Sequence, residues 1–506
     1  MKYKPLLFLL LIVVAFTTKA QSVAKGESLM NDYKYAEAIV ELKPIADKGN
    51  SSAIRKIAEC YMKVNDYVNA EKYYSIVVAD KNVLSKHLLS YAEMLMYNEK
   101  YTEATKQLNL FLEREKTNVK AIEKAKKMLL SCDKSLTHKD TTNRKFEFYN
   151  LKALNSVASD FSAISYQDSA ILFTSSRAGK INAWDGNSFA QVYIAEKIND
   201  TAYNIEPLNG VINTKNYNSG PACIDTTQTK IYYTKNNFQY GDAITNKKGD
   251  VTLKIFEANL KGNNTKDFKE LEFNDKEYSC AYPTISKDAL LMFFTSDRAG
   301  GFGGKDIYYS IKKGGVWSKP KNAGPIINTE GDERYPFLME DGSLYFSSNG
   351  HAGFGGMDIF VAKRNLLNEY AVVEHLGEPF NSNADDFGFY LDNNYKKGFI
   401  SSNRNGGLGL DDIYAFEYFD IPTTINIKFE NIFLDSIKIS IVDSATQTIT
   451  TDSINGNAYH ILLQPNNSYF ISVEKENFIK NDFTIITTQQ LQPINKNIYL
   501  TKKEEE

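Results

Sequence analysis

The chain has 506 residues, so several domains are expected, because a single domain usually spans about 100 to 200 residues. Its 42% hydrophobic and 24% charged content is typical of globular proteins and excludes a largely disordered chain. The formal net charge is −3 and no basic stripe stands in the sequence, so nucleic acid is not expected as a partner. The 32 tyrosines and 30 phenylalanines favour strands.

Residues 1–20 have the pattern of a secretory signal peptide. Two lysines precede the apolar run Leu6–Phe16, and the small-x-small cleavage site Thr18–Ala20 follows it. The run is shorter than the roughly 20 residues that a membrane-spanning helix needs, and no second run approaches that length. We therefore expect export across the inner membrane and a mature chain that begins near Gln21, with a formal charge of −6.

Residues 22–135 are predicted to form an α-solenoid of paired helices. A phrase that begins at Tyr35 recurs at Tyr67 and Tyr101, close to the period of about 34 residues that tetratricopeptide repeats have. Small residues recur where paired helices must approach closely, at Ala38, Ala70 and Ala104 and at Gly26, Ala58 and Ala92. We expect three repeats and a capping helix over Val119–Cys132, with a generic helical bundle as the alternative. Stacked helix pairs form a concave groove suited to a peptide or a partner helix.

After a polar linker, residues 145–419 change to short strands and turns. One phrase occurs three times at a nearly constant interval, as SDRAGGFGGKDIYYS, SNGHAGFGGMDIFVA and SNRNGGLGLDDIYAF. A period of about 50 residues predicts a β-propeller, here with five blades, and with six as the alternative. The blade signatures end in Leu172–Arg177, Tyr232–Asn237, Phe293–Arg298, Tyr345–Gly350 and Ile400–Arg404. A strand within residues 145–154 is expected to close the ring against the last blade, which removes exposed sheet edges.

Each copy of the phrase combines a glycine cluster with an aspartate. The glycines are expected to supply positive φ angles in a turn between two strands, with Gly303, Gly355 and Gly407 as the repeated positions. The aspartates are expected to accept backbone N–H groups in that turn. Calcium binding and ligand contact at the propeller mouth are the alternatives for these aspartates, which are Asp306, Asp358 and Asp412. A phosphate-binding loop is excluded, because Lys305 is followed by aspartate rather than Ser or Thr.

From residue 421 to 500 the strands alternate in polarity between Asn, Gly and Pro turns, which predicts a small β-sandwich. Residues 501–506 are expected to form a charged, solvated tail.

The four cysteines have no CxxC spacing, so a metal site is not expected. Two pairings, Cys60 with Cys132 and Cys223 with Cys280, are possible in an oxidising compartment, and four buried free thiols are the alternative.

No arrangement typical of a hydrolase is found. The five histidines stand singly, and no GxSxG or HExxH motif occurs. The carboxylate pairs Asp385–Asp386 and Asp411–Asp412 are adjacent, so in a strand their side chains point to opposite faces. His351 is expected as a surface residue of a glycine turn, and Trp184 and Trp317 are expected to pack within blades, with a stacking platform as the alternative. We therefore expect neither catalysis nor a cofactor.

The order of these regions resembles the PorE-like proteins of Bacteroidota, which are periplasmic, associated with the outer membrane, and linked to type IX secretion and gliding motility. The resemblance rests on the three glycine phrases, the order of domains and the segment DSINGNAYHILLQPNNSYFISVEKENF. It implies tetratricopeptide repeats, a TolB-like or WD-repeat-like propeller and a carboxypeptidase-regulatory-like sandwich. The family's OmpA-like domain has no counterpart before Glu506, and no lipoprotein cysteine follows the apolar run, so contact with peptidoglycan is expected to be indirect.

The sequence thus leads us to expect a non-enzymatic periplasmic scaffold that binds envelope proteins, such as an outer-membrane porin-like protein or a secretion-system subunit. A module that binds a glycan or a peptide in the propeller channel is the alternative.

Overall fold

The fold was examined in a computed structural model of the chain. It describes residues 23–503 except 82, 138–145, 168, 200, 215, 240–241, 366–368, 393–395, 419–422, 431–436, 455–457, 465–466 and 488–493. The predicted signal peptide and most of the predicted linker lie outside the described residues, as does the end of the charged tail. Among the helices of the described part, none is both long and apolar enough to cross a membrane.

The described chain begins with antiparallel helices. Residues 23–31 form the first helix. The next six helices are α2 (Tyr35–Ala46), α3 (Ser51–Lys63), α4 (Tyr67–Val78), α5 (Ser85–Tyr97), α6 (Tyr101–Arg114) and α7 (Val119–Thr137). The Asn50 side chain caps α3 and the Asp66 side chain caps α4, each by accepting a backbone N–H of the first helical turn. The last helix extends beyond the end of the capping helix predicted from the sequence.

The small residues singled out in the sequence lie where the helices touch. Ala38, Ala58, Ala70, Ala92 and Ala104 are fully buried. At Gly26, an added Cβ would lie 2.5 Å from the Leu42 side chain, so the first helix can approach α2 only without a side chain there.

The turns within the helix pairs repeat as well. Tyr33, Asn65 and Glu99 have φ angles of 58°, 60° and 60°, and each lies just before the second helix of its pair. This left-handed conformation lets the chain reverse within a few residues.

The central region consists of β-sheets, numbered one to five here in chain order. Sheet one contains β2 (Asp160–Tyr166), β3 (Ala170–Ser175), β4 (Gln191–Asn199) and β5 (Ala202–Pro207). Sheet two contains β6 (Asn209–Gly210), β7 (Ser219–Ile224), β8 (Lys230–Asn236), β11 (Leu253–Lys261) and β12 (Asn264–Glu270), next to the short hairpin of β9 (Phe238–Gln239) and β10 (Asp242–Ala243).

The later sheets carry the repeated phrase. Sheet three contains β13 (Cys280–Ile285), β14 (Leu291–Ser296), β15 (Asp306–Lys313), β16 (Val316–Trp317) and β17 (Lys321–Asn322). Sheet four contains β18 (Glu333–Leu338), β19 (Leu344–Ser348), β20 (Asp358–Arg364) and β21 (Tyr370–His375). Sheet five contains β22 (Asp386–Leu391), β23 (Lys397–Ser402), β24 (Asp412–Tyr418) and β1 (Phe146–Asn150).

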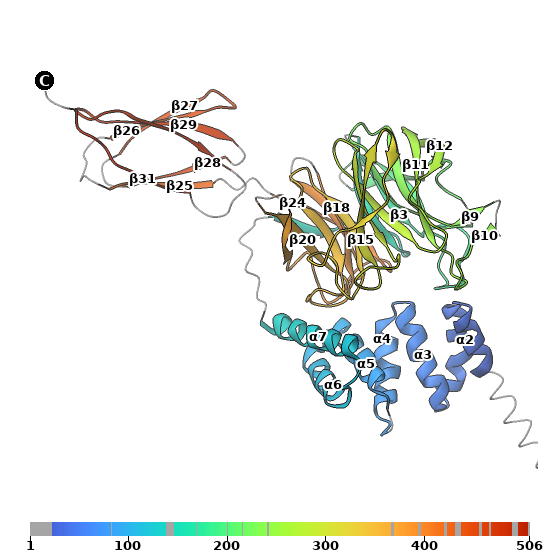
Figure 1. The fold of residues 1–506 in the computed structure, drawn as a ribbon. Coiled ribbons are helices and arrows are strands. Elements are labelled where there is room, and N and C mark those ends of the chain that lie inside the picture. The colour runs from blue at the N-terminus through green and yellow to red at the C-terminus, as the bar shows by residue number, and fades with distance from the viewer. Residues whose placement is uncertain are drawn as a thin grey trace, which may run out of the picture. The chain divides into compact units, whose positions relative to one another are not determined.

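The sheets form a closed, propeller-like β domain (Figure 1). The first strands of the sheets, β2, β7, β13, β18 and β22, contact one another in this order, and β22 contacts β2. We call these five the inner strands. Each lies at one end of its sheet's strand order. The closing strand expected within residues 145–154 is confirmed, because β1 pairs with β24 of the last sheet.

A second region of β-structure follows. One sheet contains β25 (Thr423–Phe429), β28 (Ala458–Leu463) and β31 (Ile494–Ile498), and the other contains β26 (Ile437–Asp443), β27 (Ile449–Ile454), β29 (Ser468–Glu474) and β30 (Asn481–Ile486). Alternate residues of these strands, such as Ile437, Ile439 and Ile441, enter a shared apolar core. The helices and the ring belong to one compact unit, and these two sheets belong to a second.

Candidate functional site

The aspartates of the repeated phrase fix the turns before β15, β20 and β24. The carboxylate of Asp306 accepts the backbone N–H of Phe302 at 2.6 Å and that of Gly303 at 3.1 Å. Asp358 and Asp412 accept N–H groups from the corresponding positions of their own turns. All three aspartates are at most 2% exposed. The sequence-based prediction of a turn-fixing role is confirmed.

An outer strand supplies a further donor to each of these carboxylates. Asn322 of β17 donates to Asp306 at 2.8 Å, and Asn150 of β1 donates to Asp412 at 2.6 Å. His375 Nε2 of β21 lies 3.2 Å from Asp358 Oδ1. Each buried carboxylate therefore links the turn to the outer edge of its sheet.

This geometry disfavours the calcium alternative for the three aspartates. Their oxygens face N–H groups, whereas calcium requires six to eight oxygen ligands. In the part of the chain that the structure describes, no group of three or more His, Cys, Asp or Glu side chains is placed to hold a metal ion.

The glycines of the phrase are required for close approach, and the positive φ angles expected within the clusters occur in the first and third clusters but not at the repeated positions Gly303, Gly355 and Gly407. Gly300 and Gly406 have φ of 90° and 88°, but the three predicted glycines lie outside the left-handed region. A Cβ at Gly303 would lie 2.6 Å from the backbone carbon of Glu330, in the loop that leads into the next sheet. A side chain at this position would push adjacent sheets apart.

The repeat register also needs a correction at the third copy. Gly407 lies five residues before its aspartate, whereas Gly303 and Gly355 lie three residues before theirs. Gly409 is the true counterpart, since its added Cβ would meet the backbone of residues 156–158 in the adjoining loop. An added Cβ at Gly407 would instead lie 2.9 Å from the Asp412 carboxylate.

Each of the five sheets also has an asparagine, not predicted from the sequence, whose side chain hydrogen-bonds to the backbone of the third strand. Asn328 accepts the Ile307 N–H at 2.7 Å and donates to the Ile307 carbonyl at 2.9 Å. The same pair of bonds joins Asn155, Asn213, Asn274 and Asn381 to Ile413, Val192, Ile255 and Ile359. These asparagines recur at nearly regular intervals along the chain, which is a signal that the glycine phrases obscured.

The first residue of each inner strand is buried, and it is Asp in sheets one and five, Ser in sheet two, Cys in sheet three and Glu in sheet four. Arg177 donates to Asp160 in sheet one, and Arg404 donates to Asp386 in sheet five, both at 2.5 Å. In sheet three the corresponding arginine, Arg298, donates to the Cys280 thiol at 3.2 Å. The arginine of the blade signature therefore binds a buried group next to the ring axis.

Sheet four breaks this pattern. Its buried carboxylate is Glu333, which is 0% exposed, but glycine stands at the position of the arginine. Hydroxyl groups of Thr329 and Ser348 donate to the Glu333 carboxylate at 2.6 and 2.7 Å. Burial nevertheless raises the pKa of Glu333 to about 7.

The helices contact the face of the ring that carries the phrase turns, which we call the phrase face. Tyr67 donates to one oxygen of Asp385 at 2.6 Å, and Tyr97 lies 3.4 Å from the other. The two tyrosine rings stack with centroids 3.7 Å apart. Asn383 donates to the Tyr97 carbonyl, and an added Cβ at Gly356 would lie 2.6 Å from the Tyr97 hydroxyl.

Burial raises the pKa of both tyrosines well above the usual range, and the Asp385 charge adds to the effect. Tyr67 and Tyr97 therefore stay protonated and can keep donating to the carboxylate. We call Tyr67, Tyr97 and Asp385 the joint.

Further contacts between the helices and the phrase face lie along the helices, and together with the joint they form the contact surface. Lys127 of α7 forms an ion pair with Glu330 at 2.6 Å, and Ser131 Oγ accepts the Gly353 N–H at 3.2 Å. At the other end, the Tyr33 hydroxyl donates to Asp250 at 2.8 Å. Loops from several sheets thus hold the helices.

Trp184 belongs to this contact surface, so the expectation that it packs within a blade is wrong. Its ring is 45% exposed, stacks on Tyr33 and meets Tyr35 edge-on. Trp317 does pack within the ring, where it is 5% exposed and contacts Tyr232 and Phe273. The two tryptophans therefore do not form one stacking platform.

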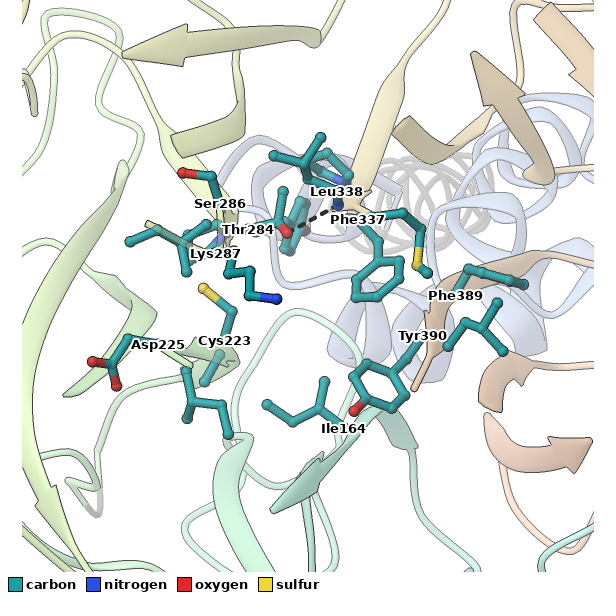
Figure 2. Close-up of a pocket in the computed structure, with 18 of the residues that line it drawn as sticks. Ile164, Cys223, Asp225, Thr284, Ser286, Lys287, Phe337, Leu338, Phe389 and Tyr390 are labelled. Atoms are coloured by element: carbon teal, nitrogen blue, oxygen red, sulfur yellow. Dashed lines mark hydrogen bonds between the residues drawn. The ribbon is translucent and has the colours of Figure 1, made fainter. Parts of the chain in front are cut away.

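The other ends of the inner strands surround a cavity of about 530 Å³, which we call the cup. The cup is bordered by all five inner strands and by the turns that follow them. Figure 2 shows Phe337 and Tyr390 across the hollow from Cys223 and Asp225. The cup is a candidate binding site, because ligand pockets are concave, mostly apolar and carry a few polar groups.

The inner strands bend where they enter the cup. In each inner strand the pairing register shifts near the start, after the first residue of β7 and after the second residue of the other four strands. Tyr282 and Tyr335 have φ of 57° and 52° at this point, which is rare for bulky residues. Their rings stack at 4.1 Å, and Tyr335 also contacts Phe387 at 4.8 Å. Aromatic rings therefore form the floor of the cup.

These residues were missed in the sequence, although a signal was present. Tyr-Pro pairs occur at Tyr282–Pro283 and Tyr335–Pro336, at nearly the same interval as the repeated phrase.

His351 is also placed differently from the sequence-based expectation. Its ring packs between Phe346 and Phe360, and Nε2 lies 2.8 Å from the Ile327 carbonyl. Burial lowers the pKa of His351, so the ring is neutral at pH 7. It is a packed residue of the phrase face rather than an exposed one.

The four cysteines are free thiols in the structure. Burial raises the pKa of Cys60 to about 12 and that of Cys280 to about 11. The pKa values of Cys132 and Cys223 are raised by burial as well, so none of the four is an activated nucleophile.

The adjacent carboxylates have separate partners. Asp385 binds the joint tyrosines while Asp386 pairs with Arg404. Asp411 accepts the Ser159 hydroxyl and Asp412 fixes its turn. Burial raises the pKa of Asp411 to about 6, yet its oxygen is bound to a hydroxyl of the adjoining loop. These contacts are all structural.

Comparisons with known proteins give remote similarities. No family model matches the chain. No curated protein sequence matches it either. Among solved structures, a TolB-type protein of Agrobacterium tumefaciens is 14% identical, and the match covers 63% of this chain and 97% of that chain with a TM-score of 0.32.

Two enzymes are similar to the same degree. A gluconolactonase of Xanthomonas campestris is 10% identical over 56% of this chain and 94% of that chain, with a TM-score of 0.32. A glycosyl hydrolase of Bacteroides ovatus is 10% identical over 55% of this chain and 95% of that chain, with a TM-score of 0.34. Similarity at this level says nothing about function, which must be inferred from the residues of this chain.

Proposed function

We propose that the chain is a non-enzymatic scaffold of the bacterial periplasm, which holds parts of an envelope machine together through protein contacts. Type IX secretion and gliding motility are the processes that the resemblance to PorE-like proteins suggests. In this proposal the helices are tetratricopeptide repeats and the ring is a five-bladed, TolB-like propeller. The last two sheets are a carboxypeptidase-regulatory-like sandwich.

Repeated contacts support this assignment of modules. The same asparagine contact occurs once in each of the five sheets, so we take each sheet as one blade. Positive φ angles at Tyr33, Asn65 and Glu99 recur close to the period of about 34 residues that tetratricopeptide repeats have. The apolar run Leu6–Phe16 supports export, and the low basic charge argues against nucleic acid.

The joint is the observation that carries the scaffold proposal. Its stacked tyrosines and shared carboxylate are buried between the helices and the propeller, where an unpaired charge would be costly. Such contacts couple two binding modules into one body, so that partners on each are held in a defined arrangement. A scaffold requires this arrangement, whereas an enzyme requires a cluster of reactive groups.

The test is chemical cross-linking in cells that carry the full chain, followed by purification and mass spectrometry. We expect recovery of an outer-membrane porin-like protein or a secretion-system subunit. The variant Asp385→Ala should lower the recovery of partners that contact both modules. Asp242→Ala removes an exposed carboxylate of β10 and serves as the control. Hydrolytic activity that stays with the purified chain and is lost on changing one carboxylate would contradict the proposal.

A second candidate function is the capture of a small glycan or a peptide by the propeller alone. The cup favours it, because a cavity of about 530 Å³ lies on the ring axis. Binding of soluble oligosaccharides by the purified chain, with no protein recovered by cross-linking, would support this function over the scaffold.

A further inference from the structure

We propose that the cup binds an extended segment of a protein partner, which inserts a large apolar side chain and presents a basic residue at the rim. The inference deepens the proposed scaffold function, on which it rests for the nature of the occupant. It assigns partner recognition to the end of the ring opposite the joint.

The wall of the cup is apolar. Phe337, Phe389 and Tyr390 come from two adjacent inner strands, and their rings lie 5.3 to 6.1 Å apart where Phe337 meets the other two. Ile164, Ile224 and Leu338 lie around the remaining sides. Large apolar side chains are the groups that gain most from transfer into such a wall, since burial is worth about 1.5 to 3 kcal/mol for each.

The backbone of the wall offers few hydrogen-bond donors. Pro221, Pro283 and Pro336 stand in three of the five inner strands and have no backbone N–H. The N–H of Leu338 is already used, because it donates to Thr284 Oγ1 at 3.1 Å. A sugar presents hydroxyl groups on every side and needs many donors and acceptors, so this wall suits an apolar side chain better than a glycan.

The inner strands provide a second means of binding a peptide. Each is the last strand of its sheet on the side of the ring axis, so one backbone edge has no strand paired to it among the described residues. An extended peptide can hydrogen-bond to such an edge through its main chain.

The charge of the rim favours a basic occupant. Three carboxylates line the cup, those of Asp225, Asp288 and Glu340, together with two cations, Lys287 and Arg364, and Lys287 pairs with Glu340 at 2.9 Å. Asp225 and Asp288 form no ion pair with any residue that the structure describes, and they accept only hydroxyl and backbone groups of their turns. Hydrogen bonds from Ser286 and Leu290 lower the pKa of Asp288, so its charge persists at neutral pH. The carboxylates outnumber the cations by one, and Asp288 is exposed, so the rim attracts lysine or arginine.

The experiment selects peptides from a phage-displayed library of random dodecapeptides on the purified full chain. We expect enrichment of sequences with an aromatic or large aliphatic residue next to Lys or Arg. A synthetic, dye-labelled copy of an enriched peptide is then titrated with the chain by fluorescence anisotropy. Binding should weaken as salt is raised, because exposed charges are screened within about 10 Å at 0.1 M.

Two variants test the two parts of the inference. Phe337→Ala should raise the Kd of the peptide at least about tenfold, because it removes an aromatic anchor. The double variant Asp225→Asn with Asp288→Asn should raise it about threefold to tenfold and reduce the salt dependence. Each amide keeps one acceptor oxygen for the backbone N–H groups of its turn, so this variant is expected to fold even if Phe337→Ala does not. Phe302→Ala alters an exposed phenylalanine of the phrase face and should leave the Kd unchanged.

Four outcomes would overturn the inference: no peptide enriched, acidic peptides enriched, binding indifferent to both cup variants, or oligosaccharide binding that the cup variants abolish. Cross-linking in cells tests the scaffold function separately. Partners recovered equally well with the Asp225→Asn and Asp288→Asn chain would leave the scaffold proposal standing and remove only the cup from it.

Discussion

The two ends of the ring use the same strands for different purposes. At the phrase face, buried carboxylates, asparagines and tyrosines have hydrogen-bond partners, and the helices lie against the loops. At the cup, the same inner strands end around a hollow that is lined by aromatic and proline side chains. The repeated phrase and the asparagines thus stabilise the fold, while the cup is lined mostly by other residues of the inner strands. The most conspicuous motif of the chain is therefore a guide to assembly rather than to binding.

The comparison predicts that changes at the phrase face lower stability, whereas changes at the cup rim do not. The largest effect is expected for Asp306→Ala, which leaves three donors of a buried turn without an acceptor. The free energy of unfolding should fall by about 3 to 5 kcal/mol in urea denaturation. Asp242→Ala, at an exposed carboxylate, should change it by less than about 0.5 kcal/mol. An equal loss of unfolding free energy for both variants would contradict the special role of the phrase aspartates.

The pH dependence of stability should reveal Glu333. Its pKa is about 7 in the folded chain, above the ordinary value of 4.5 for this side chain. The protonated form is favoured by folding, so the contribution to stability is complete below about pH 4.5 and is lost as the pH rises through about 7. The free energy of unfolding should drop by roughly 3 kcal/mol between about pH 5 and pH 8 on this account.

Glu333→Gln should remove that decrease, as measured by urea denaturation at the two pH values. Glu369→Gln, at an exposed residue just before β21, serves as the control and should keep it. A decrease that persists in Glu333→Gln would assign the pH dependence to another group.

The asparagine contacts should be worth somewhat less than the phrase aspartates, because they are neutral. Asn381→Ala leaves the buried Ile359 N–H without its acceptor and removes one of two donors to the Ile359 carbonyl, which keeps the Leu376 N–H. We expect a loss of about 2 to 3 kcal/mol. Asn426→Ala, which removes an exposed hydrogen bond to Asn495, should cost less than about 1 kcal/mol in the same denaturation experiment.

A substitution at the joint should lower the free energy of unfolding by less than the substitutions above. Tyr67→Phe keeps the ring stack on Tyr97 but removes the donor to Asp385. A loss of about 1 to 2 kcal/mol is expected, together with faster hydrogen exchange in α4 and α5. Tyr33→Phe removes a comparable hydroxyl at an exposed site and is the matched control. Unchanged exchange in Tyr67→Phe would mean that the joint does not couple helices and ring.

The smallest effect is expected at the cup. Lys287→Ala removes an ion pair with Glu340 in which the lysine side chain is 67% exposed. Such pairs contribute about 0 to 1 kcal/mol, so thermal unfolding should hardly change. A large loss of stability would show that the rim also supports the fold.

The fold was predictable where the sequence repeats. The helix pairs could be located because small residues recur at a fixed spacing, and the closing strand because it precedes the first signature. The phrase aspartates could be assigned to turns because carboxylates accept N–H groups at such positions.

The Tyr-Pro pairs at Tyr282 and Tyr335 were the one signal of the cup, and the rest of its lining could not be predicted, because it comes from five strands that stand far apart in the chain. The role of the glycines was misjudged for a related reason. Close approach of Gly303 to the loop before the next sheet is a contact in space, which local sequence does not reveal. Trp184 was misplaced because the helices that cover it lie far away in the sequence.

The pairing of β1 with β24 has a consequence for folding kinetics. Asn150 and Asp412, which are hydrogen-bonded across this pair, are separated by 262 residues in the chain. The ring can therefore close only after β24 has become available to β1, and until then the edges of these two strands stay unpaired. A newly made chain passes through an open, aggregation-prone intermediate, and its yield should depend on chaperones more strongly than its final stability would suggest.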